Sequence, residues 1–475
     1  MRRVWTASAI LVAVCAATTC AQQPEAATAR PSDIPRFVVH GGGRQEAYRS
    51  APQASWPSLP FGAPPAPSQR PAPSPRPAPS PRPALTLAEL EEIAAANNPT
   101  LRQAQARIEA ARGRWVQGGL RPNPVVGFSG DEIGEEDAAG QYGFFVGQKY
   151  ITGNKLGLNQ RVAEREIGIV VQDSIAQRWR VLTDVRLAYY DLLISQRRVA
   201  IAGDMKRIST DAVDTIRALV AGEQAARVAL LQAEVEAEST VVLVASAHNE
   251  REAAWRRLAA VLGTPNRPLA EVEGVVDQAL PAIVWNETLE RLCSQSPEIA
   301  AATANIERAR WALQRAEVEA MPDVNVQLGV SYDDSTNDVF STVQVSIPIP
   351  IHNRNQGGIH TARADIVTAE QDAGRIALDL QRRLAEVYRK YANSHQKAER
   401  YRESILPKAQ ESLELVTLGY KAGEKNYPYL TLLTAQRTLF DAQMSYLDAL
   451  REIWAANVEI EGMLLTRSLE ALPSG

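Results

Sequence analysis

Residues 97–126 and 295–324 are two copies of one pattern, and this duplication constrains the fold more than any other feature. The first copy is "NNPTLRQAQARIEAARGRWVQGGLRPNPVV" and the second is "QSPEIAAATANIERARWALQRAEVEAMPDV". Internal repeats of this kind indicate tandem structural units, so we expect two equivalent halves. Five residues match at one constant offset: Pro99 with Pro297, Ile108 with Ile306, Glu109 with Glu307, Arg112 with Arg310, and Pro124 with Pro322.

Each copy of the repeat leads into segments in which apolar and polar residues alternate. In "DVNVQLGVSY", residues 323–332, every second residue is apolar, and those between are small or polar. Such alternation is typical of a strand with two different faces. The segments "PVVGFSGDE", "GQYGFFVGQKYI" and "STVQVSIPIPI" follow the two copies in the same way. We therefore expect four strands, at about residues 124–131, 141–151, 323–333 and 341–351.

Long helices account for most of the remaining sequence. Between Val125 and Thr264 the chain contains no proline, and helix-forming residues dominate from 154 to 262. A helix over 156–218 would be roughly 95 Å long at 1.5 Å per residue, and such a rod needs a partner of similar length. Its buried seam is predicted by apolar residues at steps of three and four: Ile175, Trp179, Leu182, Val185, Tyr189 and Leu192.

Each half therefore has the order helix, strand, strand, long helix, tip and return helix. The first half is expected over residues 85–280 with its tip at 219–226, and the second over 281–470 with its tip at 420–428. The predicted fold class is mainly α with a small membrane β part. Duplicated helix–strand–strand–helix halves would form long antiparallel helical hairpins.

The two faces of the strands suit a boundary between lipid and water. Such strands can also border a soluble core, but these helices would run far past a sheet that they covered. Four strands cannot close a barrel, because transmembrane barrels have about eight or more, so several chains would share one. The lipid-facing residues would be Val324, Val326, Leu328, Val330, Val343, Val345 and Ile347. The lumen-facing residues would be Asn325, Gln327 and Ser331.

The N-terminal region has the features of an exported protein. Arg2 and Arg3 precede the apolar stretch "VWTASAILVAVCAA", so residues 1–21 are predicted to be a signal peptide. A lipid anchor at Cys20 is the alternative processing. More than half of the 29 prolines lie between Pro24 and Pro83, which predicts a Pro-rich disordered linker over residues 22–84.

The ordered repeat resembles the TolC family of outer-membrane efflux proteins. The likeness covers residues 85–468 and includes the "NP" and "SP" openings, "YKAGE" at the second tip and "LLTAQRTLFDA" after it. It implies a homotrimer with a twelve-stranded β-barrel in the outer membrane and a twelve-helix α-barrel across the periplasm. It also implies a periplasmic adaptor and an inner-membrane pump as partners. Within the family, the chain looks closer to the cobalt–zinc–cadmium resistance branch than to drug or haemolysin exporters.

The hairpin tips are the candidate docking sites for the adaptor that the resemblance implies. A tight reversal between long helices favours glycine at a positive φ, which is a structural reason for Gly222 and Gly423. The charged neighbours Glu223, Glu424 and Lys425 would contact the adaptor.

Composition and motifs argue against other classes of protein. A net charge of −4 gives no indication of nucleic-acid binding. We find no Gly-rich phosphate loop, no GxSxG and no HExxH, so no enzyme activity and no cofactor is expected. The five histidines form no HxH or HxxxH cluster, and no bound metal is expected. The function indicated is a passive exit duct of a tripartite efflux system. A duct for type I protein secretion, or a periplasmic adaptor or structural coiled-coil protein, are the alternatives.

Overall fold

The structure, a computed structural model, describes residues 84–133, 140–277, 281–422 and 427–470. All of them belong to one unit of the chain, residues 82–475. None of the helices in these ranges combines the length and apolarity of a bilayer span. The elements of the first half are α2 (Leu87–Asn97), α3 (Pro99–Gly119), β1 (Val125–Asp131), β2 (Gln141–Tyr150), α4 (Lys155–Ala221) and α5 (Arg227–Val261). Those of the second half are α6 (Trp285–Gln295), α7 (Pro297–Glu317), the 3₁₀ turn η3 (Val318–Ala320), β3 (Val324–Asp333), β4 (Asp338–Ser346), α8 (Gln356–Arg400), the π-helical turn η4 (Tyr401–Ile405), α9 (Leu406–Lys421) and α10 (Tyr429–Glu461).

The matching residues of the repeat have matching roles at the start of α3 and α7. Asn98 and Ser296 are the N-caps, and each side-chain oxygen accepts the backbone N–H two residues further on, at 2.9 and 3.3 Å. Pro99 and Pro297 take the first helical position, where the missing N–H has no helical partner to lose. The "NP" and "SP" openings are thus helix starts.

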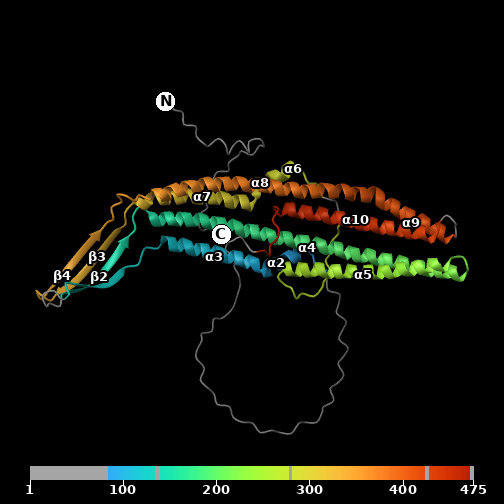
Figure 1. Cartoon of the computed structure of the whole chain (residues 1–475), viewed down its shortest axis with the longest axis horizontal. Helices are drawn as coiled ribbons and strands as arrows, with labels where there is room; N and C mark the ends of the chain where they lie inside the picture. Colours follow the sequence, from blue (N-terminus) through green and yellow to red (C-terminus); the bar gives the residue numbers. More distant parts are fainter. Residues whose placement is uncertain (1–83, 134–139, 278–280, 423–426, 471–475) are drawn as a thin grey trace, which may run out of the picture. The chain divides into compact units, whose positions relative to one another are not determined.

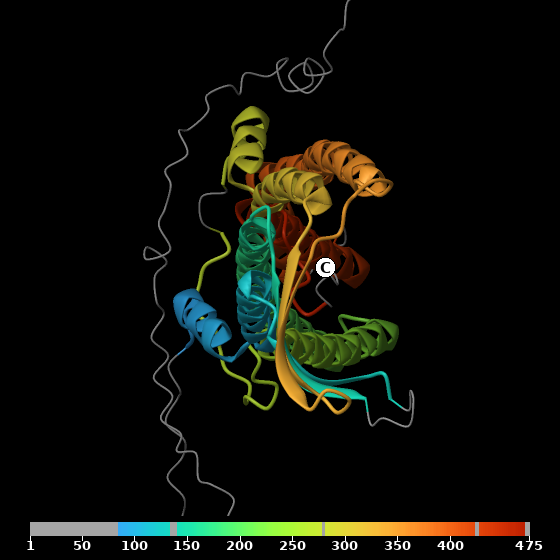
Figure 2. The ribbon, with the colours of Figure 1, turned by 90° about the vertical axis from the view of Figure 1, so that its left-hand side faces the viewer.

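The helices form one curved layer. Towards the sheet, α4 packs against α3 and α7, and α7 packs against α8; towards the tips, α4 packs against α5 and α10, and α10 against α8 and α9 (Figure 1). The short helices α2 and α6 lie apart from each other on the convex side of the layer, α2 against α4 and α6 against α7 and α8 (Figure 2). This order leaves α3 and α5 at one edge of the layer and α8 and α9 at the other.

The main core lies at the middle of the helical layer, where both halves of the chain meet. It includes part of the seam predicted for α4. Val185, Tyr189 and Leu192 are buried in this core as expected. The prediction was wrong at Ile175, which is 41% exposed. Nearer the sheet α4 is flanked by α3 and α7, and it buries the smaller Ala176 there instead. One heptad register therefore does not hold along the whole helix.

The four strands form one antiparallel sheet in the order β1-β2-β3-β4. The first three lie within one residue of their expected bounds. The fourth was expected at 341–351, and this was wrong, because β4 spans Asp338–Ser346. Its start is early because Asp333 Oδ1 accepts the backbone N–H of Ser335 at 2.9 Å and closes a tight turn. Its end is early because Pro348 and Pro350 have no N–H for a ladder, so Ile347 lies just beyond the strand.

Candidate functional site

One face of the sheet is apolar and exposed. Cross-strand pairing places Phe144 beside Val330 and Val146 beside Leu328 on this face. Leu328 and Val330 are each 55% exposed, and no described element packs over them. The residues predicted to face lipid within the strands share this face: Val324, Val326, Leu328, Val330, Val343 and Val345. Ile347, 50% exposed, follows β4. An apolar area of this kind marks a surface that is covered by something other than water.

The opposite face of the sheet is polar and rich in glycine. Asn325, Gln327 and Ser331 lie on it, as do Gly143 and Gly147, which pair with Ser331 and Gln327. A Cβ atom at Gly143 would lie 2.0 Å from Ser331 Oγ, so that position has no room for a side chain. A Cβ at Gly147 would meet nothing nearer than 3.9 Å. The division of residues between two faces thus holds along β3, whereas in β2 Phe145 lies on the polar face and Gln148 on the apolar face.

A shared carboxylate joins the two halves where the sheet meets the helices. Asp323, just before β3, accepts hydrogen bonds from Lys155 Nζ at 2.9 Å and from the backbone N–H of Thr152 at 3.2 Å. Lys149 Nζ lies 3.1 Å from its second oxygen. Desolvation raises the pKa of Asp323, but the hydrogen bonds from Lys155, Thr152 and Lys149 outweigh it and lower the pKa to about 2. This pairing could not be predicted from the sequence, because the partners lie in different halves.

The first tip differs from the expectation at its glycine. Gly222 caps α4 with φ −88°, and the residue with positive φ is Glu223, at 57°. The predicted need for glycine was therefore wrong at 222, because the left-handed residue comes one position later. Glu223 is exposed, as a docking residue must be. Gly423, Glu424 and Lys425 lie outside the described residues.

Beside the tips, both hairpins share a small core. It joins α4, α5, α9 and α10 through Val213, Ile216, Ala233, Val416, Tyr429, Leu432 and Ala435. Above it, Arg437 Nη2 of α10 lies 2.5 Å from Glu236 Oε2 of α5, and Glu236 is buried. Burial, with the Glu236 charge, raises the pKa of Tyr429 to about 12. The ends of the two hairpins are thus held together within one chain.

Two rows of charges tie α4 to the helices on both its sides. In one row, Asp191 of α4 pairs with Arg451 of α10 at 2.5 Å and with Arg257 of α5 at 3.8 Å. In the next row the signs are reversed: Arg198 of α4 pairs with Glu250 of α5 at 3.0 Å and with Asp448 of α10. Most of these residues line a groove of about 1150 Å³ formed by α4, α5, α8 and α10.

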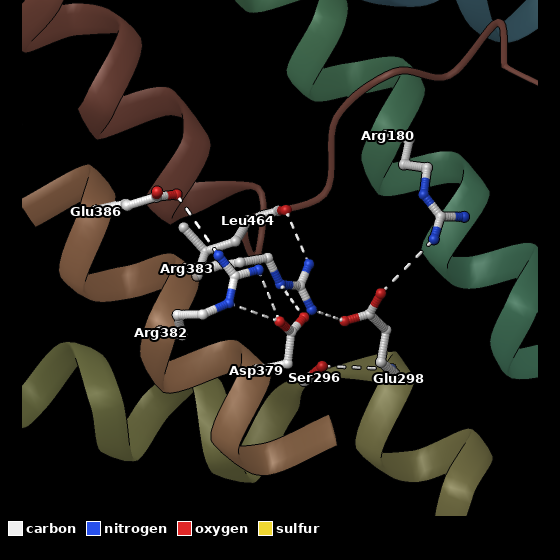
Figure 3. Close-up of polar contacts among 8 residues, drawn as sticks. All are labelled: Arg180, Ser296, Glu298, Asp379, Arg382, Arg383, Glu386 and Leu464. Atoms are coloured by element: carbon white, nitrogen blue, oxygen red, sulfur yellow. Dashed lines mark hydrogen bonds and ion pairs between the residues drawn. The ribbon is translucent and has the colours of Figure 1, made fainter. Parts of the chain in front are cut away.

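A second charge cluster lies at the start of α7. Arg383 of α8 pairs with Glu298 of α7, which Arg180 of α4 approaches from the other side at 3.7 Å (Figure 3). Arg383 also donates to the carbonyl of Leu464 at 3.3 Å, so it fastens the end of the chain to the layer. Asp379 receives a hydrogen bond from Arg382, which lowers the pKa of that carboxyl. Each of these groups has a partner within the chain, so the cluster is a structural clamp.

The described part of the chain holds no group of three or more His, Cys, Asp or Glu side chains placed to bind one metal ion. The candidate functional site consists of the two-faced sheet, the curved layer and the tips.

The comparisons with known proteins agree with this geometry. The model of the family described as "Outer membrane efflux protein" matches residues 90–264 and 288–464, one match for each half. The cobalt-zinc-cadmium resistance protein CzcC of Cupriavidus metallidurans is 29% identical over 385 residues, covering 80% of this chain and 90% of that one. The nickel-cobalt-cadmium resistance protein NccC of Alcaligenes xylosoxydans xylosoxydans is 25% identical over 302 residues, covering 60% of this chain and 66% of that one.

Solved structures show the same fold at lower identity. CusC, described as a transmembrane channel, superposes with a TM-score of 0.68 at 19% identity, over 80% of this chain and 92% of that one. The outer membrane protein VceC of Vibrio cholerae superposes with a TM-score of 0.65 at 18% identity, over 80% of this chain and 96% of that one. The expected resemblance and fold class are confirmed. The chain belongs to the outer membrane efflux protein family.

Proposed function

We propose that this chain is one protomer of a homotrimeric exit duct that spans the outer membrane and continues into the periplasm. The observation that carries the proposal is the open four-stranded sheet with one apolar face, one polar face and unpaired edges at β1 and β4. A sheet in lipid must close so that no edge is left without hydrogen bonds. Three copies supply twelve strands, which is within the range of membrane barrels.

The dimensions of the apolar face fit a bilayer. Tyr142 and Tyr150 lie on this face at the two ends of β2, eight residues apart, which is about 26 Å of strand. Membrane barrels carry an apolar band of about 25 Å between two girdles of aromatic residues. The Val and Leu face would then contact lipid, and Asn325, Gln327 and Ser331 would line the lumen.

The helical layer provides the periplasmic part of the duct. α4 has 67 residues and is about 100 Å long, far more than the sheet needs for support. The curvature of the helical layer leaves a concave side (Figure 2). Three copies would turn this side inward to form a tunnel of twelve helices. The tips at Gly222, Glu223, Gly423, Glu424 and Lys425 would dock a periplasmic adaptor, and an inner-membrane pump would supply the energy.

The names of the curated relatives support divalent metal ions as cargo. CzcC and NccC are both described as resistance proteins for cobalt and cadmium, with zinc or nickel. A strain without this chain should lose tolerance to cobalt, zinc or cadmium salts and keep its tolerance to drugs. Unchanged metal tolerance, together with loss of a secreted protein, would favour the type I secretion alternative.

The mass of the particle extracted from the outer-membrane fraction tests the duct itself. We expect three chains by light scattering corrected for bound detergent. A single chain, or protein released without detergent, would mean that the sheet is covered in another way, and the proposed duct would be rejected.

A further inference from the structure

The two halves of the chain differ in the segment that follows each hairpin. After α5, the chain passes along the convex side of the layer, where the carbonyl of Glu271 accepts the N–H of Leu85 just before α2 (Figure 2). After α10, residues 462–470, here named the post-α10 segment, take another path and reach α4. The equivalence of the two halves therefore ends with the return helices.

The post-α10 segment lies on the concave side of the layer. Asp184 of α4 accepts the backbone N–H groups of Arg467 at 3.0 Å and of Ser468 at 2.6 Å. Arg186, two residues further along α4, pairs with Glu91 of α2 at 2.6 Å, and α2 lies on the convex side (Figure 2). Residues two apart on a helix point in directions about 200° apart. Asp184 and the segment that it binds therefore face the concave side.

The post-α10 segment is held in place by side chains of two helices. Gln177 of α4 donates to the carbonyl of Ser468 at 2.8 Å, and Arg383 of α8 donates to that of Leu464 at 3.3 Å (Figure 3). Three of its residues other than glycine have φ values of 57°, 59° and 63°: Met463, Leu464 and Arg467. Such backbone conformations are unfavourable and persist only where the surrounding contacts fix them, which points to a function for the segment.

One side of the post-α10 segment is exposed above the layer. Leu465 and Ser468 are buried, whereas Leu469 is 51% exposed and the side chains of Arg467 and Glu470 are 74% and 66% exposed. Arg467 Nη1 lies 3.4 Å from Glu470 Oε1. Because an exposed ion pair of this kind is weak, both charged groups stay in contact with water.

We propose that the post-α10 segment narrows the lumen of the duct and that Arg467 sets the preference of the lumen between cations and anions. This inference rests on the proposed trimer, in which the concave sides face inward. The segment crosses α4 between Gln177 and Asp184, about 33–44 Å from the start of that helix. Three copies would therefore form a ring inside the helical tunnel, far from both the barrel and the tips.

The width expected for the tunnel makes this ring a constriction. Twelve helices spaced by about 10 Å form a circle about 38 Å across between opposite axes, which leaves roughly 28 Å between their inner surfaces. A backbone laid over the inner surface adds about 5 Å on each side and reduces the width to about 18 Å. Every ion in transit would then pass within about 9 Å of the ring, which is close to the Debye length at about 0.1 M salt. Rings of charged side chains at such distances set the selectivity of pores.

Cysteine cross-linking tests the position of the segment in the full-length chain. Arg467→Cys is combined with Cys293→Ser, and the particle from the outer-membrane fraction is treated with a bis-maleimide. Three cysteines on a circle about 18 Å across lie about 16 Å apart, within reach of a long flexible reagent. We expect bands of two and three chains on a denaturing gel.

Arg267→Cys in the same background is the matched control. Arg267 follows the last residue of α5 at the same distance as Arg467 follows that of α10. Its charge acts on Glu89 of α2, so it lies on the convex side. Copies of this residue on the outside of the trimer would be more than about 40 Å apart, and no linked chains are expected.

Reversal potentials of the purified particle in a planar bilayer test the role of Arg467. Arg467→Glu reverses one charge in each copy and should raise the permeability ratio of cations to anions about twofold or more in about 0.1 M KCl. In about 1 M KCl the Debye length falls to about 3 Å, and the shift should nearly vanish. Arg267→Glu should leave the ratio unchanged in both solutions.

The results separate the constriction from the duct itself. A particle of three chains that gives no linked bands with Arg467→Cys would reject the constriction and leave the duct in place. Linked chains without a change in reversal potential in Arg467→Glu, or with an equal change in Arg267→Glu, would reject the role given to Arg467. A particle of one chain would reject the proposed duct as well.

Discussion

At the residue scale, Asp323 connects the two halves of the chain. The Asp323 carboxylate accepts hydrogen bonds from Lys155 and Thr152 of the first half. Asp323 itself directly precedes β3 of the second half. This contact therefore links the two halves of the chain at the junction between the helices and the sheet. The two lysines differ in burial, since the Lys155 side chain is 6% exposed and the Lys149 side chain is 49% exposed.

This difference gives a paired prediction. Lys155→Met should lower the stability of the subunit by about 2 kcal/mol, since it leaves a half-buried carboxylate without its nearest charge. Lys149→Met should cost about 1 kcal/mol or less, because exposed ion pairs contribute little. Thermal unfolding of the extracted particle at pH 7 measures both. Equal shifts in the two variants would contradict the role given to burial.

The same contact predicts a pH dependence. The pKa of Asp323 falls from its ordinary value of 3.8 to about 2 in the folded chain, so its stabilising effect is fully present above pH 4. It is lost as the pH falls from 4 towards 2, where the folded carboxylate takes up its proton. The stability difference between the parent and Asp323→Asn should therefore be constant from pH 7 to 5 and shrink below pH 4.

At the element scale, the role proposed for the sheet depends on its two different faces. Leu328, near the middle of β3, belongs to the exposed apolar face, and its neighbour Gln327 points the other way. A shift of the strand register by one residue would move Leu328 to the polar face and Gln327 to the apolar face. A charge at each position therefore distinguishes the faces.

We predict that Leu328→Lys lowers barrel stability by about 2–4 kcal/mol, the cost of lysine at the middle of a bilayer. Gln327→Lys should assemble normally, since it would face water in the lumen. The amount of trimer in the outer-membrane fraction is the measurement. Similar loss in both variants would mean that the sheet does not separate lipid from water.

The sequence predicted the elements well and their ends less well. α4 was expected at 156–218 and spans Lys155–Ala221, because a proline-free helical stretch is a strong signal. The start of β4 was predicted too late, because the turn before it depends on one Asp333 side chain. In the sequence, such a tight turn has the same polar composition as a longer loop. Pairing between Lys155 and Asp323 could not be predicted, since it depends on how the two halves pack. The two faces of β3 were predictable from alternation alone.

At the scale of the whole molecule, the edges of the described unit determine how copies of it can associate. Identical copies related by rotation would join β1 to β4, and the helices at those edges would follow. The described part of the chain begins at residue 84, and Leu85 is already tied to the rest of the unit. Its N–H donates to the carbonyl of Glu271 and its own carbonyl accepts from the N–H of Glu273, at 2.9 and 3.0 Å.

We therefore predict that the Pro-rich segment is dispensable for assembly. A chain lacking residues 24–84, with the signal segment kept, should give a particle of three chains, shorter only by the deletion. A deletion of 24–90 is the matched control, because it also removes Leu85 and Leu90, and Leu90 is fully buried. Loss of the oligomer with the shorter deletion would contradict the prediction.

If the proposed duct forms, the glycines on the polar face of the sheet would have a consequence for the width of its lumen. A glycine inside a strand costs stability, and at Gly147 a Cβ atom would meet nothing nearer than 3.9 Å in its own subunit. At Gly329 the nearest atom would lie at 3.5 Å, an ordinary contact. Packing within the chain thus gives no reason for glycine at either position. In the proposed duct both positions would face the lumen, where a larger residue would narrow the passage once in each of the three copies.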